Sequence, residues 1–133
     1  SNPHILTISP PLDMRAKWFS PYVAYTMAKF GMSMCMLGMA EEFKGDCIAC
    51  NCLWPRTIIA TAALQMIPDV DFETGRTPEI VADAANAILC RNSRSCTGNF
   101  FIDDTVLTEE GITDFEKYSV NRDKELSTDI FLD

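Results

Sequence analysis

Short apolar runs alternate along the chain with longer stretches of helix-forming residues. Residues 4–9 are apolar and β-branched, which predicts a strand. Pro10 ends this run, because proline lacks the backbone donor that a sheet ladder needs. Residues 22–43 are rich in Ala, Met and Leu and predict a long helix, with Gly45 where a C-cap belongs.

The second half of the chain continues the same alternation. A run that is apolar at nearly every position predicts a strand over residues 47–54. Residues 59–66 predict a loop and a helix, and residues 78–89 predict another helix with proline in its first turn. Residues 98–102 predict a third strand. The remainder is acidic and polar, and we expect it to wrap on the surface of the domain.

The order of these elements predicts an α/β fold. Strand, helix, strand, helix, helix, strand is typical of right-handed crossover units around a parallel sheet. Strands that are apolar at nearly every position favour a sheet covered on both faces. A complete doubly wound sheet has about six strands. Three predicted strands therefore indicate part of such a domain.

Composition and charge narrow the class of protein. The formal net charge of -8 over 133 residues excludes non-specific binding to nucleic acid or anionic membranes, which needs an excess of Lys and Arg. No apolar run reaches the roughly 20 residues that span a bilayer. The first residues do not have the pattern of a signal peptide. Cys35, Cys50 and Cys52 lie in predicted helix and strand, which predicts buried thiols and a reducing intracellular compartment.

Two clusters could hold a metal ion. Cys47, Cys50 and Cys52 have the local spacing of a zinc knuckle, but no second ligand pair follows in a motif. Cys50 and Cys52 would also face away from Cys47, because side chains alternate along a strand. Asp103 and Asp104 could bind a cation, although acidic pairs at strand ends are more often solvated turn residues. We favour structural cysteines and a solvated acidic turn over metal sites.

Tyr25 and Lys29 form the strongest candidate pair for chemistry. They are separated by four positions within the predicted long helix and therefore lie on one face of it. An ammonium group close to a phenol favours the phenolate, so we expect Lys29 to lower the pKa of Tyr25. A tyrosine tuned in this way can exchange a proton with an alcohol oxygen near neutral pH. The spacing alone is weak evidence, since many proteins contain it by chance.

The residues around this pair resemble the short-chain dehydrogenase/reductase family. In that family a Y-x-x-x-K helix is followed by a strand that ends in a V-N-x-x-x-P pattern, and here Asn51 and Pro55 occupy those places. Residues 5–9 resemble the family strand that ends at the active-site serine, and residues 95–103 resemble its last strand. The resemblance covers nearly the whole chain, with the motifs in the family's order and spacing.

The resemblance implies a fold and an activity. The fold would be the C-terminal half of a doubly wound, Rossmann-type parallel sheet, with about three strands and flanking helices over residues 1–133. The activity would be that of an NAD(P)-dependent oxidoreductase, which transfers a hydride between nicotinamide and a carbonyl or alcohol, with NADP slightly favoured over NAD. No G-x-x-x-G-x-G phosphate loop occurs in the 133 residues, so activity would need a separate N-terminal cofactor half. Steroid, fatty acyl, other lipid-like and small carbonyl substrates all stay open.

The resemblance also implies three catalytic roles. Tyr25 would be the general acid/base at the substrate carbonyl or alcohol. Lys29 would bind the nicotinamide ribose and lower the pKa of Tyr25. Ser9 would supply the hydroxyl that orients the substrate oxygen, although the family usually has a second serine where this chain has Pro10.

Cofactor contacts are implied for the loop after the second strand. Pro55 would begin this loop, the backbone near Ile59 would hold the nicotinamide carboxamide, and Thr61 would lie close to the cofactor phosphates. Arg56 replaces the usual glycine. Its side chain could cover a phosphate or face solvent, and we favour the second.

Partners and location follow from the resemblance as well. The family commonly dimerises through the Y-x-x-x-K helix, so we expect a homo-oligomer there, with Phe30, Ser33 and Gly38 as interface candidates. Members of the subgroup most similar in sequence are associated with peroxisomes and mitochondria, and the cytoplasm is the alternative location. An alternative function is a non-catalytic, structural half-domain subunit of a larger assembly.

Overall fold

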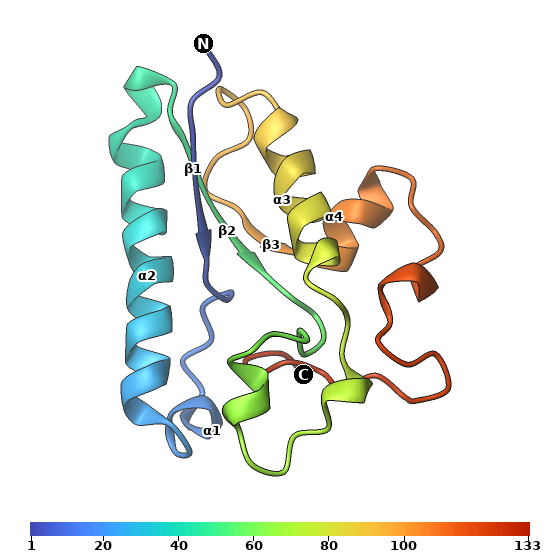
Figure 1. Ribbon diagram of the computed structural model, residues 1–133. Helices are drawn as coiled ribbons and strands as arrows, with labels where there is room; N and C mark the ends of the chain where they lie inside the picture. The colour runs from blue at the N-terminus through green and yellow to red at the C-terminus, as the bar shows by residue number, and fades with distance from the viewer.

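The computed structural model describes residues 1–133 as a three-stranded parallel sheet with helices on both faces (Figure 1). The strands are β1 (His4–Ile8), β2 (Ala49–Trp54) and β3 (Phe100–Ile102), in the order β1-β2-β3. This confirms the predicted α/β class and its three parallel strands. The second strand begins two residues later than predicted, because Cys47 adopts a left-handed conformation with φ of 58°.

The three strands differ in how far they are covered. All six residues of the central strand β2 are buried. The strand β1 pairs with β2 along one edge only, and Ile5 and Ile8 on it are 39% and 42% exposed. The short strand β3 pairs with the last half of β2. The sheet therefore has a fully covered centre and an open edge at β1.

Helix α2 (Val23–Glu42) covers one face of the sheet (Figure 1). Its buried residues recur every three or four positions, which is the spacing of one helix face; they are Thr26, Phe30, Ser33, Met36 and Ala40. The short helix α1 (Ala16–Phe19) precedes it. Two hydroxyls of the buried face fix α2 in place, since Thr26 donates to the Trp18 carbonyl and Ser33 donates to the Pro10 carbonyl, at 2.7 and 2.6 Å.

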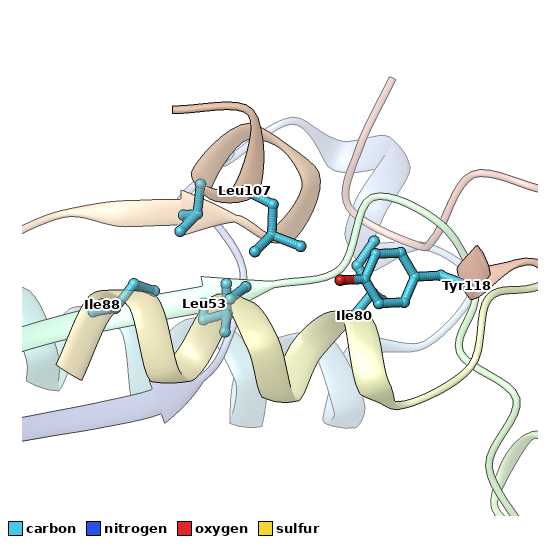
Figure 2. Close-up of a cluster of buried hydrophobic side chains, with 7 residues drawn as sticks. Leu53, Ile80, Ile88, Leu107 and Tyr118 are labelled. Carbon is cyan, nitrogen blue, oxygen red and sulfur yellow. The ribbon is translucent and has the colours of Figure 1, made fainter. Parts of the chain in front are cut away.

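Helices α3 (Glu79–Cys90) and α4 (Asp103–Glu109) cover the other face. Figure 2 shows the main core, in which Leu53 of β2 lies beside the helix that carries Ile80 and Ile88, with Leu107 of α4 above them. Ile80, Ala84 and Ile88 are spaced by four positions and form the buried stripe of α3. Burying side chains of this size stabilises the fold by about 1.5–3 kcal/mol each.

The polar segment after α4 contributes more to the core than predicted. Tyr118 and Phe131 are both 3% exposed, and Tyr118 closes one end of the core in Figure 2. The Tyr118 hydroxyl donates to Asp83 of α3 at 2.6 Å. The expectation of a purely surface tail is therefore wrong, because single aromatic residues spaced along it fill gaps between the layers.

Several boundaries also differ from the prediction. Residues 59–66 form no α-helix, only a 3-10 turn at Leu64–Met66. Gly45 is not the helix C-cap, since α2 ends at Glu42 with Phe43 as its C-cap and Gly45 lies in the following 3-10 turn. Asp103 begins α4 and is fully buried, so it is not a solvated turn residue.

The surface of α2 differs from the expected interface. Phe30 and Ser33 are 1% and 0% exposed and pack beneath the helix, so neither is available to a partner through this face. Gly38 is exposed, as are Met27 and Met34 on the outer face of the helix. None of the helices combines the length and the apolarity that crossing a membrane requires.

The free cysteines divide into buried and exposed groups. Cys50 and Cys52 are 0% and 1% exposed and pack with Met36 between β2 and α2, as predicted. Cys35 is exposed, so the prediction that it is buried is wrong. It lies on the outer face of α2, one position before a core residue.

Candidate functional site

A hollow of about 980 Å³ opens at the carboxyl ends of β1 and β2. Its lining is mostly apolar and comes from the strand ends, from α2, from the loop after β2, from α3 and from the C-terminal segment. The carboxyl ends of parallel strands are where open α/β sheets bind ligands. Among the residues with predicted roles, the hollow brings together Tyr25, Lys29, Pro55, Ile59 and Thr61.

Tyr25 stands at the wall of this hollow. Its side chain is 46% exposed, and its ring stacks on that of Phe131 with the centroids 6.0 Å apart and the planes 10° apart. Burial raises the pKa of the Tyr25 phenol above its ordinary value of 10.0, and the negative charge of Asp129 raises it further. The structure of this chain does not show the lowering expected from Lys29, which is not among the groups that shift this pKa.

Lys29 lies one helical turn beyond Tyr25, and its ammonium group is held at the end of β1. The Nζ atom donates a hydrogen bond to the Ile8 carbonyl at 3.1 Å, and it lies 5.4 Å from the centroid of the Trp54 ring. A carbonyl and an aromatic face both stabilise a cation. These contacts fix the ammonium group at the strand end, within the lining of the hollow.

Ser9 does not reach the hollow. It is fully buried between the sheet and α2, beside the thiol of Cys52 and in the layer that also holds Ser33. Side chains alternate along a strand, and Ile8 is the residue at this strand end that lines the hollow. The structure therefore does not support Ser9 as the hydroxyl that orients a substrate oxygen.

The loop after β2 places Ile59 against the hollow through a short backbone bridge. Ala60 N–H donates to the Arg76 carbonyl at 2.8 Å, and Arg76 N–H donates to the Ile58 carbonyl at 3.0 Å. The N–H of Ile59 itself makes no hydrogen bond within the chain. Gly75 permits this close approach, because a Cβ atom there would lie 2.8 Å from the Ile58 carbonyl oxygen.

Arg56 and Thr61 have partners within the chain. The Arg56 guanidinium forms an ion pair with Asp104 at 2.6 Å, and the Arg56 N–H donates to the buried Asp103 carboxylate at 3.0 Å. Arg56 therefore ties the loop to α4 while its side chain stays 45% exposed to solvent. The Thr61 hydroxyl accepts a hydrogen bond from Leu64 N–H at 3.4 Å, at the exposed rim of the hollow.

Asn51 occupies the asparagine position of the V-N-x-x-x-P pattern, and its side chain makes hydrogen bonds that connect two parts of the fold. Its side-chain amide donates to the Cys96 carbonyl at 2.7 Å, and its oxygen accepts from the N–H of Asn99 at 3.0 Å. These bonds join the middle of β2 to the turn before β3. Asn51 therefore fixes the last strand and lies outside the lining of the hollow.

Asp129 is a polar residue of the hollow that the sequence did not reveal. Its Oδ1 accepts from Ile130 N–H at 2.6 Å, and its own N–H donates to the Arg56 carbonyl at 2.9 Å. Burial raises the pKa of this carboxyl to about 6, and the charge of Asp103 adds to the effect. No local motif marks Asp129, because its place in the hollow depends on how the C-terminal segment folds back.

Aromatic contacts hold the C-terminal segment against the hollow. Phe131 packs on the rings of Trp18, Phe30 and Trp54, with centroids 5.0–6.1 Å apart. The indole N–H of Trp54 donates to the Ile130 carbonyl at 2.9 Å. This anchorage brings Asp129 and the Tyr25 ring to the same wall.

The relatives of the chain carry the names of dehydrogenases. Hydroxysteroid dehydrogenase-like protein 2 of Rattus norvegicus is 53% identical over 131 residues, and its namesake in Homo sapiens is 51% identical over 131 residues. A crystal structure titled as a short-chain dehydrogenase homologue, from Mycobacterium thermoresistibile, is 45% identical with a TM-score of 0.89. The chain is a relative of the short-chain dehydrogenases. A Xanthomonas campestris chain named as a dehydrogenase is 48% identical with a TM-score of 0.95.

The match to the short-chain dehydrogenases covers this chain fully and its relatives only in part. It takes in 98% of this chain but 25% of the rat protein and 31% of the human one. Of the two solved chains it takes in 48% each. No family model matches the chain. The family resemblance predicted from the sequence is confirmed, whereas the activity of a whole protein is a matter for proposal.

Proposed function

We propose that the chain supplies the catalytic half of an NAD(P)-dependent short-chain oxidoreductase that interconverts a carbonyl compound and an alcohol. One observation supports this most directly: Tyr25 and Lys29 both line a largely apolar hollow at the carboxyl ends of parallel strands. A proton donor in an apolar site suits a substrate that is mostly hydrocarbon and has one reacting oxygen.

The residues of the hollow fit a nicotinamide cofactor. The free N–H of Ile59 can donate to a carboxamide oxygen, and the Lys29 ammonium group offers two further donors to ribose hydroxyls beside its bond to Ile8. The cofactor would supply the hydride, with NADP or NAD as the carrier. The phosphates would need a second half of the domain, because the 133 residues contain no glycine-rich phosphate loop.

Tyr25 would donate a proton to the carbonyl oxygen during reduction and accept one during oxidation. Its phenol is uncharged at neutral pH, since burial and Asp129 both raise its pKa. It is therefore in the form that reduction requires. Lys29 would position the cofactor and, once the rest of the site is present, favour the phenolate that oxidation requires.

Assembly and location form part of the same proposal. The outer face of α2 exposes Met27, Met34 and Leu37, at 62%, 46% and 49%. Exposed apolar side chains on one helix face support a homo-oligomer that pairs through α2. A peroxisomal or mitochondrial location rests on the resemblance to the hydroxysteroid dehydrogenase-like subgroup.

The test of this function is turnover in the complete protein that contains the chain. We expect Tyr25→Phe to lower kcat for reduction of a neutral ketone by at least about 100-fold, the scale of a lost general acid, while leaving NADPH binding intact. Tyr118→Phe is the matched control, because Tyr118 lies in the core and donates to Asp83 rather than lining the hollow. We expect it to keep kcat and to lose about 1 kcal/mol of stability.

Unchanged turnover of the Tyr25→Phe variant would remove the acid/base role. Absence of both NADPH binding and turnover in the complete wild-type protein would favour the alternative function, a structural half-domain subunit. In that case Tyr25→Phe would leave the oligomeric state unchanged. Its thermal stability would differ from that of the wild-type protein only by the small effect of losing one exposed hydroxyl.

A further inference from the structure

Asp129 is the one acidic side chain in the lining of the hollow. The surrounding wall is apolar and includes Ile58, Ile130 and Trp54. A carboxylate in such surroundings interacts strongly with any charge that enters, because the local dielectric constant is low. Asp129 is therefore placed to influence which substrates are bound.

The position of Asp129 is fixed by its own backbone and by its neighbour. Its N–H donates to Arg56, and its Oδ1 accepts from Ile130, which leaves Oδ2 without a partner within the chain. No cation neutralises it, since the guanidinium of Arg56 forms its ion pair with Asp104. One oxygen of the carboxylate is thus available to a bound molecule.

The charged and titratable groups near Asp129 are few. Tyr22, Tyr25 and Lys29 line the same hollow, and Asp103 acts on Asp129 from the start of α4. The Lys29 ammonium group is held by the Ile8 carbonyl at the end of β1. Tyr25 lies close enough to Asp129 for the two groups to influence each other.

We propose that Asp129 is a specificity-determining residue that excludes substrates with a negative charge beside the reacting carbonyl and favours neutral, largely apolar ketones and alcohols. This inference rests on the proposed oxidoreductase function. Like charges that face each other in a largely apolar site repel each other. A neutral ketone meets no such repulsion, and a hydroxyl on the substrate can donate to the free Oδ2.

A pair of substrates with one carbon skeleton tests the proposal. Benzylacetone is a neutral methyl ketone, and the α-keto acid with the same phenylethyl group has a carboxylate in place of the methyl. In the complete wild-type protein with NADPH, we expect kcat/KM to favour benzylacetone at pH 8. The preference should fall by roughly tenfold at pH 5, where Asp129 is protonated and the keto acid is still an anion.

The Asp129→Asn variant should show the reduced preference at pH 8 and no change of preference between pH 8 and pH 5. Asparagine keeps the oxygen that accepts from Ile130 N–H, so the segment stays anchored. Asp123→Asn is the control, because Asp123 is exposed on the same segment and lies outside the hollow. It should retain the wild-type ratio at both pH values.

A constant substrate ratio in the wild-type protein between pH 5 and pH 8 would overturn the role of Asp129, and this measurement needs no variant. An unchanged ratio in a folded Asp129→Asn variant that still reduces benzylacetone would overturn it too. Failure of the wild-type protein to reduce either compound, with no bound NADPH, would instead refute the proposed oxidoreductase function. The two failures are therefore distinguishable.

Discussion

Tyr25 and Lys29 share one face of α2, yet their side chains contact different parts of the structure. The Tyr25 ring stacks on Phe131, whereas the Lys29 ammonium group donates to the Ile8 carbonyl. Sequence spacing places two side chains on one face, but it does not determine which neighbours they contact. The pKa of Tyr25 accordingly follows its burial and Asp129 rather than Lys29.

The negative charge of Asp129 raises the pKa of the Tyr25 phenol, and this effect can be measured. A nearby negative charge disfavours the phenolate, so removing it should lower the pKa of the phenol. We therefore expect Asp129→Asn to shift the rising limb of the pH profile for alcohol oxidation, which follows formation of the Tyr25 phenolate, to lower pH. The measurement is kcat/KM for oxidation between pH 6 and pH 11, in the wild-type protein and in the variant.

The same shift should be absent in Asp123→Asn, whose carboxylate is exposed. A shift to higher pH in Asp129→Asn would contradict the assignment of Asp129 as the neighbour that raises the pKa of Tyr25. If Asp129→Asn shifts the profile equally when Tyr25 is replaced by Phe, a group other than Tyr25 is titrating.

Individual residues show how much of this site could be predicted from the sequence. Tyr25, Lys29 and Ile59 were predicted from motifs, and the structure brings all of them to one hollow. Ser9 was predicted from the same resemblance, but the alternation of β1 turns it toward Cys52. Asp129 could not be predicted, because it enters the hollow through a segment with no regular secondary structure of its own.

The long helices and the apolar strands were predictable from the sequence, and the short helices α1 and α4 were not. The buried face of α2 follows a helical spacing over 20 residues, so both its existence and its approximate ends could be predicted. Helix α4 has 7 residues and begins at a buried aspartate. Asp103 was expected in solvent because acidic residues are rarely buried without partners. Its partners are backbone N–H groups, including that of Arg56, which is distant in sequence.

The bridge that positions Ile59 depends on a glycine. Replacing Gly75 by alanine would place a Cβ atom 2.8 Å from the Ile58 carbonyl oxygen, so the loop must shift. We expect Gly75→Ala to lower stability by about 1–3 kcal/mol, the usual cost of overpacking. It should also raise the KM for NADPH, because the free N–H of Ile59 moves with the loop. Thermal unfolding and coenzyme kinetics in the complete protein measure both effects.

Gly31→Ala is the matched control for this change. Gly31 lies within α2, and a Cβ atom there would meet nothing within 4 Å. Alanine favours a helix over glycine by about 0.5–1 kcal/mol, so this variant should be slightly more stable and should bind coenzyme normally. Equal behaviour of the two variants would show that the close approach at Gly75 has no influence on the loop.

The sheet has a free edge at β1. This strand pairs with β2 along one edge, and the exposed Ile5 and Ile8 lie on it. Parallel sheets are ordinarily buried, with both faces covered. The solved relatives are also about twice as long as this chain, which covers 48% of each. We infer that contacts from outside these 133 residues complete the hollow at the carboxyl ends of the strands.

We expect the 133-residue chain by itself to bind NADPH weakly or not at all. Most of the affinity for a dinucleotide comes from a glycine-rich loop and a helix N-terminus at the phosphates, and these residues contain no such loop. Isothermal calorimetry of the isolated chain is the measurement, with the complete protein as the positive control. Submicromolar binding by the isolated chain would contradict this account.

The parallel register of the sheet also determines how the chain folds. His4 pairs with Ala49 and Cys52 pairs with Phe100, so each ladder joins residues more than forty positions apart. Neither ladder can form until a long loop has closed around α2 or α3, and folding rates fall as such contacts become more distant. The fully buried strand β2 can be completed only when partners on both sides have formed. Refolding should consequently be slow, and dilute, cool conditions should improve the yield by keeping unpaired β2 strands of different molecules apart.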